Sequence, residues 1–166
     1  MNKQLKRVLI GITLVFGVSN CDRPRAKVSD EYLQKMRNSS PGITHSCLEK
    51  IRFGGIEVMP DQVDQCFEMT KPRRWNGLWT RDFELSRFCP APALQCSRTP
   101  DTNIIWLTLA ASAQHATQRL PTSTYRIEFL GRRTLLPGHH GHMGMSGHEI
   151  VVDRMISLSP MTLSDD

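Results

Sequence analysis

The sequence predicts an α+β protein that is mainly β: a small twisted antiparallel sheet or a partly closed barrel, with two or three short helices. Three observations favour this class. The second half of the chain alternates apolar and polar residues with the period of two that marks half-buried strands. The first half carries short helical patterns interrupted by proline and glycine. The 166 residues, less an N-terminal targeting segment, suit one domain with a substantial core.

The targeting segment is residues 1–20, which have the layout of a signal peptide. Basic residues precede an unbroken apolar run at 8–18. Two small polar residues come after this run, and Cys21 follows them directly. This run is shorter than the about 20 residues that a membrane-spanning helix needs. Residues 18–21 resemble the lipobox of bacterial lipoproteins, so we expect lipidation at Cys21. The protein should then lie on the periplasmic side of a bacterial membrane, lipid-anchored or, without the lipid, soluble in the periplasm.

The beginning of the mature chain, residues 21–44, is expected to form a polar tether with one short helix at 30–37. Ser29 can cap this helix, and two acidic residues in its first turn complement the helix dipole. A second helix is predicted at 61–69, after a proline. Its apolar face would carry Val63, Cys66 and Phe67.

The first predicted strand is residues 75–85. Its odd positions place four apolar side chains on one face, with Gly77 between two tryptophans. A glycine at such a position indicates a bulge or the close approach of another backbone. The four apolar residues are Trp75, Trp79, Phe83 and Leu85. They could line a ligand groove, but we favour a place in the core, because exposed aromatic stripes are uncommon.

The remaining elements follow from similar patterns. An apolar run of strand length and the short helical segment after it are followed by two strands with alternating side chains. These elements are expected at 104–109, 110–118, 125–129 and 150–158. We therefore expect a single compact β-rich domain over 45–160 and a flexible acidic tail at 161–166.

Cysteine usage agrees with export. Beyond Cys21 the chain has four cysteines, an even number that suits two disulfides in an oxidising compartment. Of the three possible pairings we favour Cys47 with Cys66 and Cys89 with Cys96, because each closes a short loop. A zinc site is a poorer explanation, since the chain has no Cys-x-x-Cys pair.

The charge balance argues against nucleic acid as a partner. The whole chain has a net charge of +5, of which Lys3, Lys6 and Arg7 of the signal supply three. The mature chain is therefore nearly neutral, without the strongly basic character of nucleic-acid-binding domains. The local basic clusters at 71–74 and 132–133 are expected to be solvated.

Five short segments of the second half resemble a family of uncharacterised exported proteobacterial proteins, which include lipoproteins. The resemblance covers roughly 47–157, and the segments are WNGLW at 75–79, FELSRF at 83–88, GRRT at 131–134, PGHHGHMG at 137–144 and HEIVVDR at 148–154. It implies a small extracytoplasmic domain. The family has no established activity, so the resemblance assigns no functional residues.

The main chemical lead is the segment 137–148, which holds four of the six histidines and two methionines. Imidazole and thioether groups suit copper, and imidazole alone suits zinc, while the glycines would let the loop fold around an ion. The candidate ligands are His139, His140, His142, Met143, Met145 and His148. We favour a simpler explanation, in which this is a glycine-rich connection between strands whose histidines bond to turns and main chain. No cofactor is then needed.

No catalytic residue is predicted. Ser146, His148 and Asp153 have the residue types of a hydrolase, but the segment lacks the glycine that stands two residues after the serine in a nucleophile elbow. We therefore expect a non-enzymatic, lipid-anchored envelope protein that binds an envelope protein or other ligand, or has a structural role. The first alternative is a protein that binds copper or zinc through the histidine loop. The second is a hydrolase with an unrecognised site.

Overall fold

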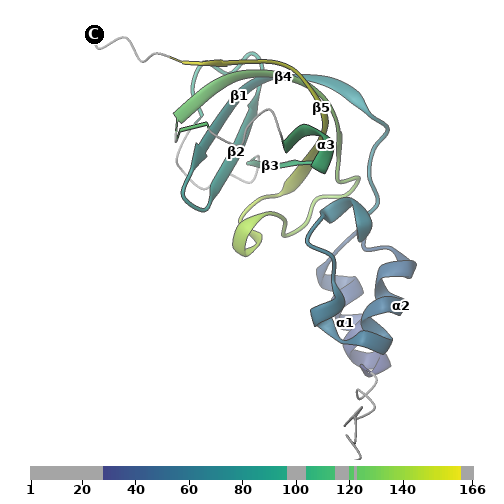
Figure 1. Cartoon of the computed structure of the whole chain (residues 1–166). Helices are drawn as coiled ribbons and strands as arrows, with labels where there is room; N and C mark the ends of the chain where they lie inside the picture. The colour runs from purple at the N-terminus through teal and green to yellow at the C-terminus, as the bar shows by residue number, and fades with distance from the viewer. Residues whose placement is uncertain (1–27, 97–103, 115–119, 122, 162–166) are drawn as a thin grey trace, which may run out of the picture.

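The computed structural model describes residues 28–96, 104–114, 120–121 and 123–161. Within this part of the chain five strands close into a barrel with neighbours in the order β1-β2-β3-β5-β4 (Figure 1). The strands are β1 (Arg73–Asp82), β2 (Leu85–Pro90), β3 (Ile105–Leu109), β4 (Ser123–Arg133) and β5 (His148–Pro160). The helices are α1 (Asp30–Ser39), α2 (His45–Gly54) and α3 (Ala111–Gln114). The prediction of a mainly β domain with two or three short helices is confirmed.

Of the two architectures expected, the barrel is the one that forms. Its strands pair antiparallel except at the β3–β5 pair, which is parallel. The direction of a neighbouring strand is not encoded in side-chain alternation, so this pair could not be foreseen. A five-stranded barrel with this strand order and one parallel closing pair has the Greek-key topology of the OB fold.

Inward-facing side chains fill the barrel, including both tryptophans of the first predicted strand. Trp75 and Trp79 are 7% and 3% exposed, and their indole N–H groups donate to the Gly131 carbonyl and the Ser86 hydroxyl. A Cβ at Gly77 would overlap the main chain around Cys89, so the predicted close approach of another backbone is confirmed. The buried members of this core are Trp75, Trp79, Phe88, Ile105, Leu107, Ala113, Tyr125, Ile127, Phe129, Ile150 and Val152.

The predicted strand 75–85 is wrong at its end, because the chain turns between Asp82 and Leu85. These two residues pair across a two-residue loop, and the Asp82 carboxylate accepts the Phe83 N–H at 2.7 Å. Glu84 completes the turn with a positive φ of 55°. Phe83 therefore lies at a hairpin tip and is 85% exposed, whereas the alternation placed it in the core.

The helices also differ from the prediction. Helix α1 begins after Ser29 as expected, with the Ser29 hydroxyl accepting from a first-turn N–H, and it continues to Ser39. The predicted helix 61–69 is wrong: only the 3-10 turn Val63–Gln65 forms there. The residues that follow it instead make isolated β-bridges, Phe67 with Ile43 and Met69 with Thr134. Tertiary pairing of the backbone overrides the helical pattern at this position.

An unpredicted helix, α2, carries Cys47 and builds a second core with α1. Thr44 caps α2 by accepting from the Cys47 N–H at 3.2 Å. The disulfides Cys47–Cys66 and Cys89–Cys96 are both present, as expected. The second core lies between the helices and the outer face of β5, and it consists of Leu33, Ile43, Cys47, Leu48, Ile51, Val63, Cys66, Phe67 and Val151. Leu33 and Ile43, from the segment expected as a tether, are thus buried.

Some expectations fall outside the described residues. These are the signal peptide, Cys21, the tail beyond Met161 and positions 115–118 of the helix expected at 110–118, of which 111–114 form α3. Among the described residues, no helix has the length and hydrophobicity needed to span a bilayer.

Candidate functional site

The connection between β4 and β5, which contains the histidine loop, is fixed by a buried carboxylate. Glu149 is 7% exposed and accepts hydrogen bonds from the Thr108 hydroxyl and, at 3.1 Å, from the Gly141 N–H. Burial raises the pKa of Glu149, while these two hydrogen bonds oppose the shift. Its N–H and carbonyl both bond to Thr134. Gly141, near the centre of the loop, is therefore attached to β5 through Glu149, and Glu149 is in turn bonded to Thr108 of β3.

Gly141 lets the loop lie directly on the barrel. Its φ is 69°, and a Cβ there would come within 2.6 Å of the Trp106 ring. Trp106 points outward from β3, in register with Arg87 of β2 and Glu149 of β5. A side chain at position 141 is excluded both by the backbone conformation and by the tryptophan.

The next residue of the loop joins it to the β1–β2 hairpin. The His142 imidazole stacks on Trp106, with ring centroids 6.5 Å apart and planes at 28°. Its Nε2 lies 3.5 Å from a carboxylate oxygen of Glu84 at the hairpin tip. Two connections that are far apart in the sequence thus meet over β3.

Large exposed apolar side chains lie next to these contacting residues in the sequence. Phe83 is 85% exposed, Met143 84% and Met145 58%. In the part of the chain that the structure describes, the non-glycine residues with positive φ are Glu84 and Met143, and both lie here. Such a conformation costs about 1–2 kcal/mol per residue and concentrates at functional sites. We call Phe83, Glu84, Trp106, His142, Met143 and Met145 the hairpin-loop surface.

The other histidines of the loop have separate environments. His140 is buried against the edge of Phe67, and its Nε2 is buried without a hydrogen-bond partner. His148 Nδ1 lies 3.1 Å from the Thr134 hydroxyl, and the exposed His139 faces the Gly144 carbonyl. Burial lowers the pKa of both His140 and His148 below the ordinary value.

The structure does not bring the predicted metal ligands together. Over the described residues, no group of three or more His, Cys, Asp or Glu side chains is placed to hold one ion. The sulfur-bearing side chains Met143 and Met145 are exposed. The imidazoles of His139 and His148 instead contact the Gly144 carbonyl and the Thr134 hydroxyl.

The residues with hydrolase chemistry are not joined either. Asp153 is bound by the Arg132 guanidinium, His148 by Thr134, and Ser146 is buried in a backbone bridge with His140. A triad requires the carboxylate to orient the imidazole, and this carboxylate is engaged elsewhere.

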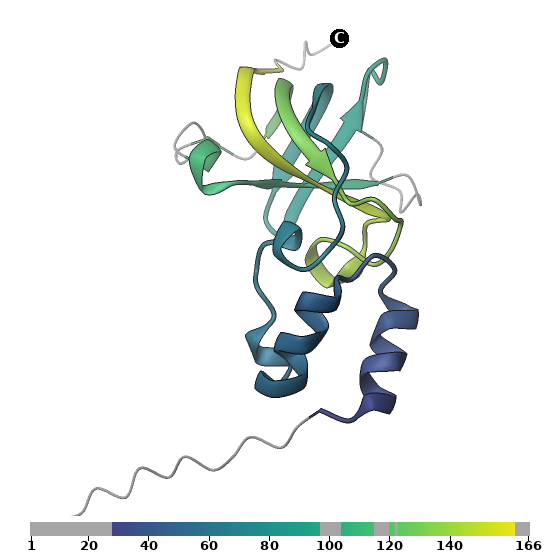
Figure 2. The ribbon, with the colours of Figure 1, turned by 90° about the vertical axis from the view of Figure 1, so that its right-hand side faces the viewer.

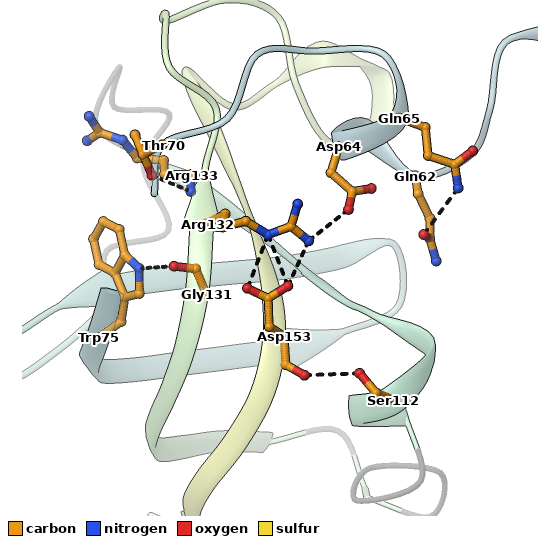
Figure 3. Close-up of polar contacts among 10 residues, drawn as sticks. All are labelled: Gln62, Asp64, Gln65, Thr70, Trp75, Ser112, Gly131, Arg132, Arg133 and Asp153. Carbon is orange, nitrogen blue, oxygen red and sulfur yellow. Dashed lines mark hydrogen bonds and ion pairs between the residues drawn. The ribbon is translucent and has the colours of Figure 1, made fainter. Parts of the chain in front are cut away.

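Sequence reasoning missed one ionic network, at Arg132 (Figure 3). The guanidinium contacts both carboxylate oxygens of Asp153 on β5, the closest at 2.7 Å, and reaches Asp64 of the 3-10 turn at 2.9 Å. Hydrogen bonding to Asp153 is the main cause that raises the pKa of Arg132. The basic pair at 132–133, expected to be solvated, thus includes a structural arginine that fastens the second core to the barrel. This ionic network becomes apparent only when the positions of the two carboxylates in the folded chain are known, and the sequence does not give those positions.

No family model, curated protein or solved structure matches this chain. The features of this chain that bear on function are the hairpin-loop surface and the signals of export.

Proposed function

We propose that this chain is an exported, lipid-anchored binding domain of the bacterial cell envelope, and that its hairpin-loop surface contacts a protein partner. The two disulfides support an oxidising compartment outside the cytoplasm. The signal-like segment 1–20 and the lipobox-like position of Cys21 support the anchor. Two acyl chains at such a cysteine give stable membrane attachment, whereas one gives only marginal binding.

The observation that supports a binding role is the exposure of apolar side chains on two connections that are held together. Phe83 and Met143 project from two connections that contact each other through Glu84 and His142. Contiguous exposed apolar patches are uncommon on monomeric proteins, and where they occur they mark contact sites. Methionine adapts its shape to the opposing surface, and aromatic side chains supply much of the energy of protein interfaces.

The chemistry of the surface favours a protein over a sugar or a nucleic acid. Gly141 and His142 cover the ring of Trp106, so Phe83 is left as the single open ring of the hairpin-loop surface on which a sugar could stack. A phosphate backbone would meet the exposed carboxylates of Asp82 and Glu84 at the hairpin tip. Apolar contact with a peptide segment of a second protein avoids both difficulties.

Site-specific photocrosslinking in cells tests the partner contact. A photoreactive phenylalanine analogue would replace Phe83, Met143 or, as a control, Leu94. Leu94 is 82% exposed and apolar, but it lies in the connection between β2 and β3. We expect one common crosslinked protein from positions 83 and 143, and none from position 94. The same adducts from all three positions, or no adducts, would contradict the proposal.

Binding of the identified partner to purified protein gives the quantitative test. The double variant Phe83→Ser plus Met143→Ser should lose at least about tenfold in affinity, equivalent to about 1.4 kcal/mol, with an unchanged melting temperature. Leu94→Ser should bind within about twofold of wild type, because Leu94 lies outside the hairpin-loop surface. Equal affinities for all variants would remove the hairpin-loop surface from the interface.

Copper or zinc binding by the histidine loop is the remaining alternative. It would require His140 to leave its buried site against Phe67 and His142 to leave Trp106. Calorimetry with Cu(I), Cu(II) and Zn(II) on the tag-free mature protein tests it. Micromolar binding that disappears in His140→Ala plus His142→Ala would promote this function.

A further inference from the structure

The end of the molecule at which the described chain begins carries a second apolar surface. Val28 donates its N–H to the Arg52 carbonyl at 3.1 Å, which joins the start of α1 to the end of α2. Both lie at the end of the helical pair that is farthest from the barrel (Figure 2). A hollow of about 630 Å³ opens there, lined by Val28, Ser29, Tyr32, Gly54, Ile56 and Glu57.

Two large apolar side chains of this hollow are exposed. Tyr32 is 44% exposed and Ile56 51%. The adjacent Phe53 of α2 is 56% exposed. We call Tyr32, Phe53 and Ile56 the helix-end surface. Tyrosine in particular suits the boundary between lipid and water, because its ring is apolar and its hydroxyl is polar.

The short covalent connection between Val28 and the expected lipid anchor at Cys21 keeps the helix-end surface close to the membrane. Seven peptide steps separate Cys21 from Val28. Each step spans at most about 3.6 Å, so the two residues lie within about 25 Å of each other. The helix-end surface, which surrounds Val28, is therefore always within reach of the bilayer that holds the lipid. The barrel is joined to the anchor only through this end.

The connecting segment adds a favourable charge. Residues 22–27 contain Arg23, Arg25 and Lys27 against the single acid Asp22. Basic residues next to a membrane attract anionic headgroups. On the folded side, the Asp30 carboxylate is paired with Arg52, while Glu57 faces the hollow. Attraction by charge thus belongs to the connecting segment, and the folded end contributes apolar contact.

We propose that the helix-end surface docks on the membrane, with Tyr32 and Ile56 at the level of the lipid headgroups, and so orients the barrel away from the bilayer. This inference rests on the proposed lipid anchor at Cys21. Docking of this kind fixes the direction in which the hairpin-loop surface is presented, which a flexible tether alone would leave free.

Hydrogen exchange of the full lipidated protein tests the docking. The protein would be reconstituted into vesicles of three parts zwitterionic and one part anionic phospholipid, and compared with Cys21→Ser protein in the same buffer. We expect amide exchange in 28–33 and 53–58 to slow by about fivefold or more in the vesicles, since docked backbone is shielded and opens less. Exchange at 82–85, in the β1–β2 hairpin, should not change.

A paired variant separates docking from anchoring. Tyr32→Ser plus Ile56→Ser should keep the protein on the vesicles through its lipid but lose the slowing at 28–33 and 53–58. Phe83→Ser, which removes an exposed ring from the hairpin-loop surface, should retain this slowing. Equal exchange with and without vesicles, in protein whose mass shows the lipid, would overturn the docking alone. A mass without lipid at Cys21 would overturn the proposed anchor, and docking with it.

Discussion

Replacing Arg132 by methionine should destabilise the domain far more than a surface substitution, because it leaves two carboxylates without their partner. Methionine keeps an unbranched apolar stem, so the change isolates the guanidinium. Breaking a buried ion pair by removing one member costs about 3–5 kcal/mol. The side chains of Asp64 and Asp153 keep 16% and 30% of their area exposed, so water compensates part of the loss. We expect a decrease of about 2–3 kcal/mol in the free energy of unfolding.

Denaturant unfolding of the disulfide-intact protein, followed by circular dichroism, measures this value. For a domain of this size it corresponds to a melting temperature lower by about 6–15 °C. Arg154→Met on β5, next to Asp153, is the control, since Arg154 is exposed and should change stability by less than about 0.5 kcal/mol. A double-mutant cycle with Asp64→Asn should give a coupling of about 1 kcal/mol or more, because the two groups are 2.9 Å apart. An Arg132→Met protein as stable as Arg154→Met would refute the reasoning.

Three further predictions concern covalent links and pH. Peptide mapping of exported protein should show Cys47 joined to Cys66, and removal of this pair should lower stability by about 2–4 kcal/mol, while a different pairing would contradict the structure. Burial lowers the pKa of His140 below 6.5, so its contribution to stability is present above that pH and is lost as the pH falls through the folded-state pKa. His140→Leu should therefore show a shallower loss of unfolding free energy between about pH 7 and 5, and an identical slope would exclude this origin. Cys21→Ser should move the protein from the membrane fraction to the soluble envelope fraction, and wild type found there already would exclude the anchor.

Sequence patterns predicted the positions of β1, β3, β4 and β5 but not of β2. The clearest signal was the period of two, which a half-buried strand imposes on its own sequence. The same signal failed at Phe83, where the alternation continues through a turn that Asp82 and Glu84 form. It also carries no information on strand direction, so the parallel β3–β5 pair was not foreseen. Helix α2 was missed, although Thr44 in retrospect is a recognisable N-cap before it.

The sequence singled out one half of the hairpin-loop surface, the part that comes from the histidine loop, but not the half that comes from the β1–β2 hairpin and β3. The histidine loop was recognised from its composition, and the structure places it against the β1–β2 hairpin through His142. The carboxylate of Glu149 that fixes the loop was not singled out, because nothing in an alternating strand indicates that one outward acid will be covered. Contacts between distant segments decide such burial, and a single sequence does not contain them.

Strand β5 takes part in both cores, and this has a consequence for the order of folding. Ile150 and Val152 complete the barrel interior, whereas Val151 between them packs against the helical layer. β5 is also the last of the five strands to be synthesised. Neither core is complete before it arrives, so a nascent chain that ends before residue 148 should remain without a stable domain. If the protein is exported as proposed, this dependence delays compaction until nearly the whole chain is available.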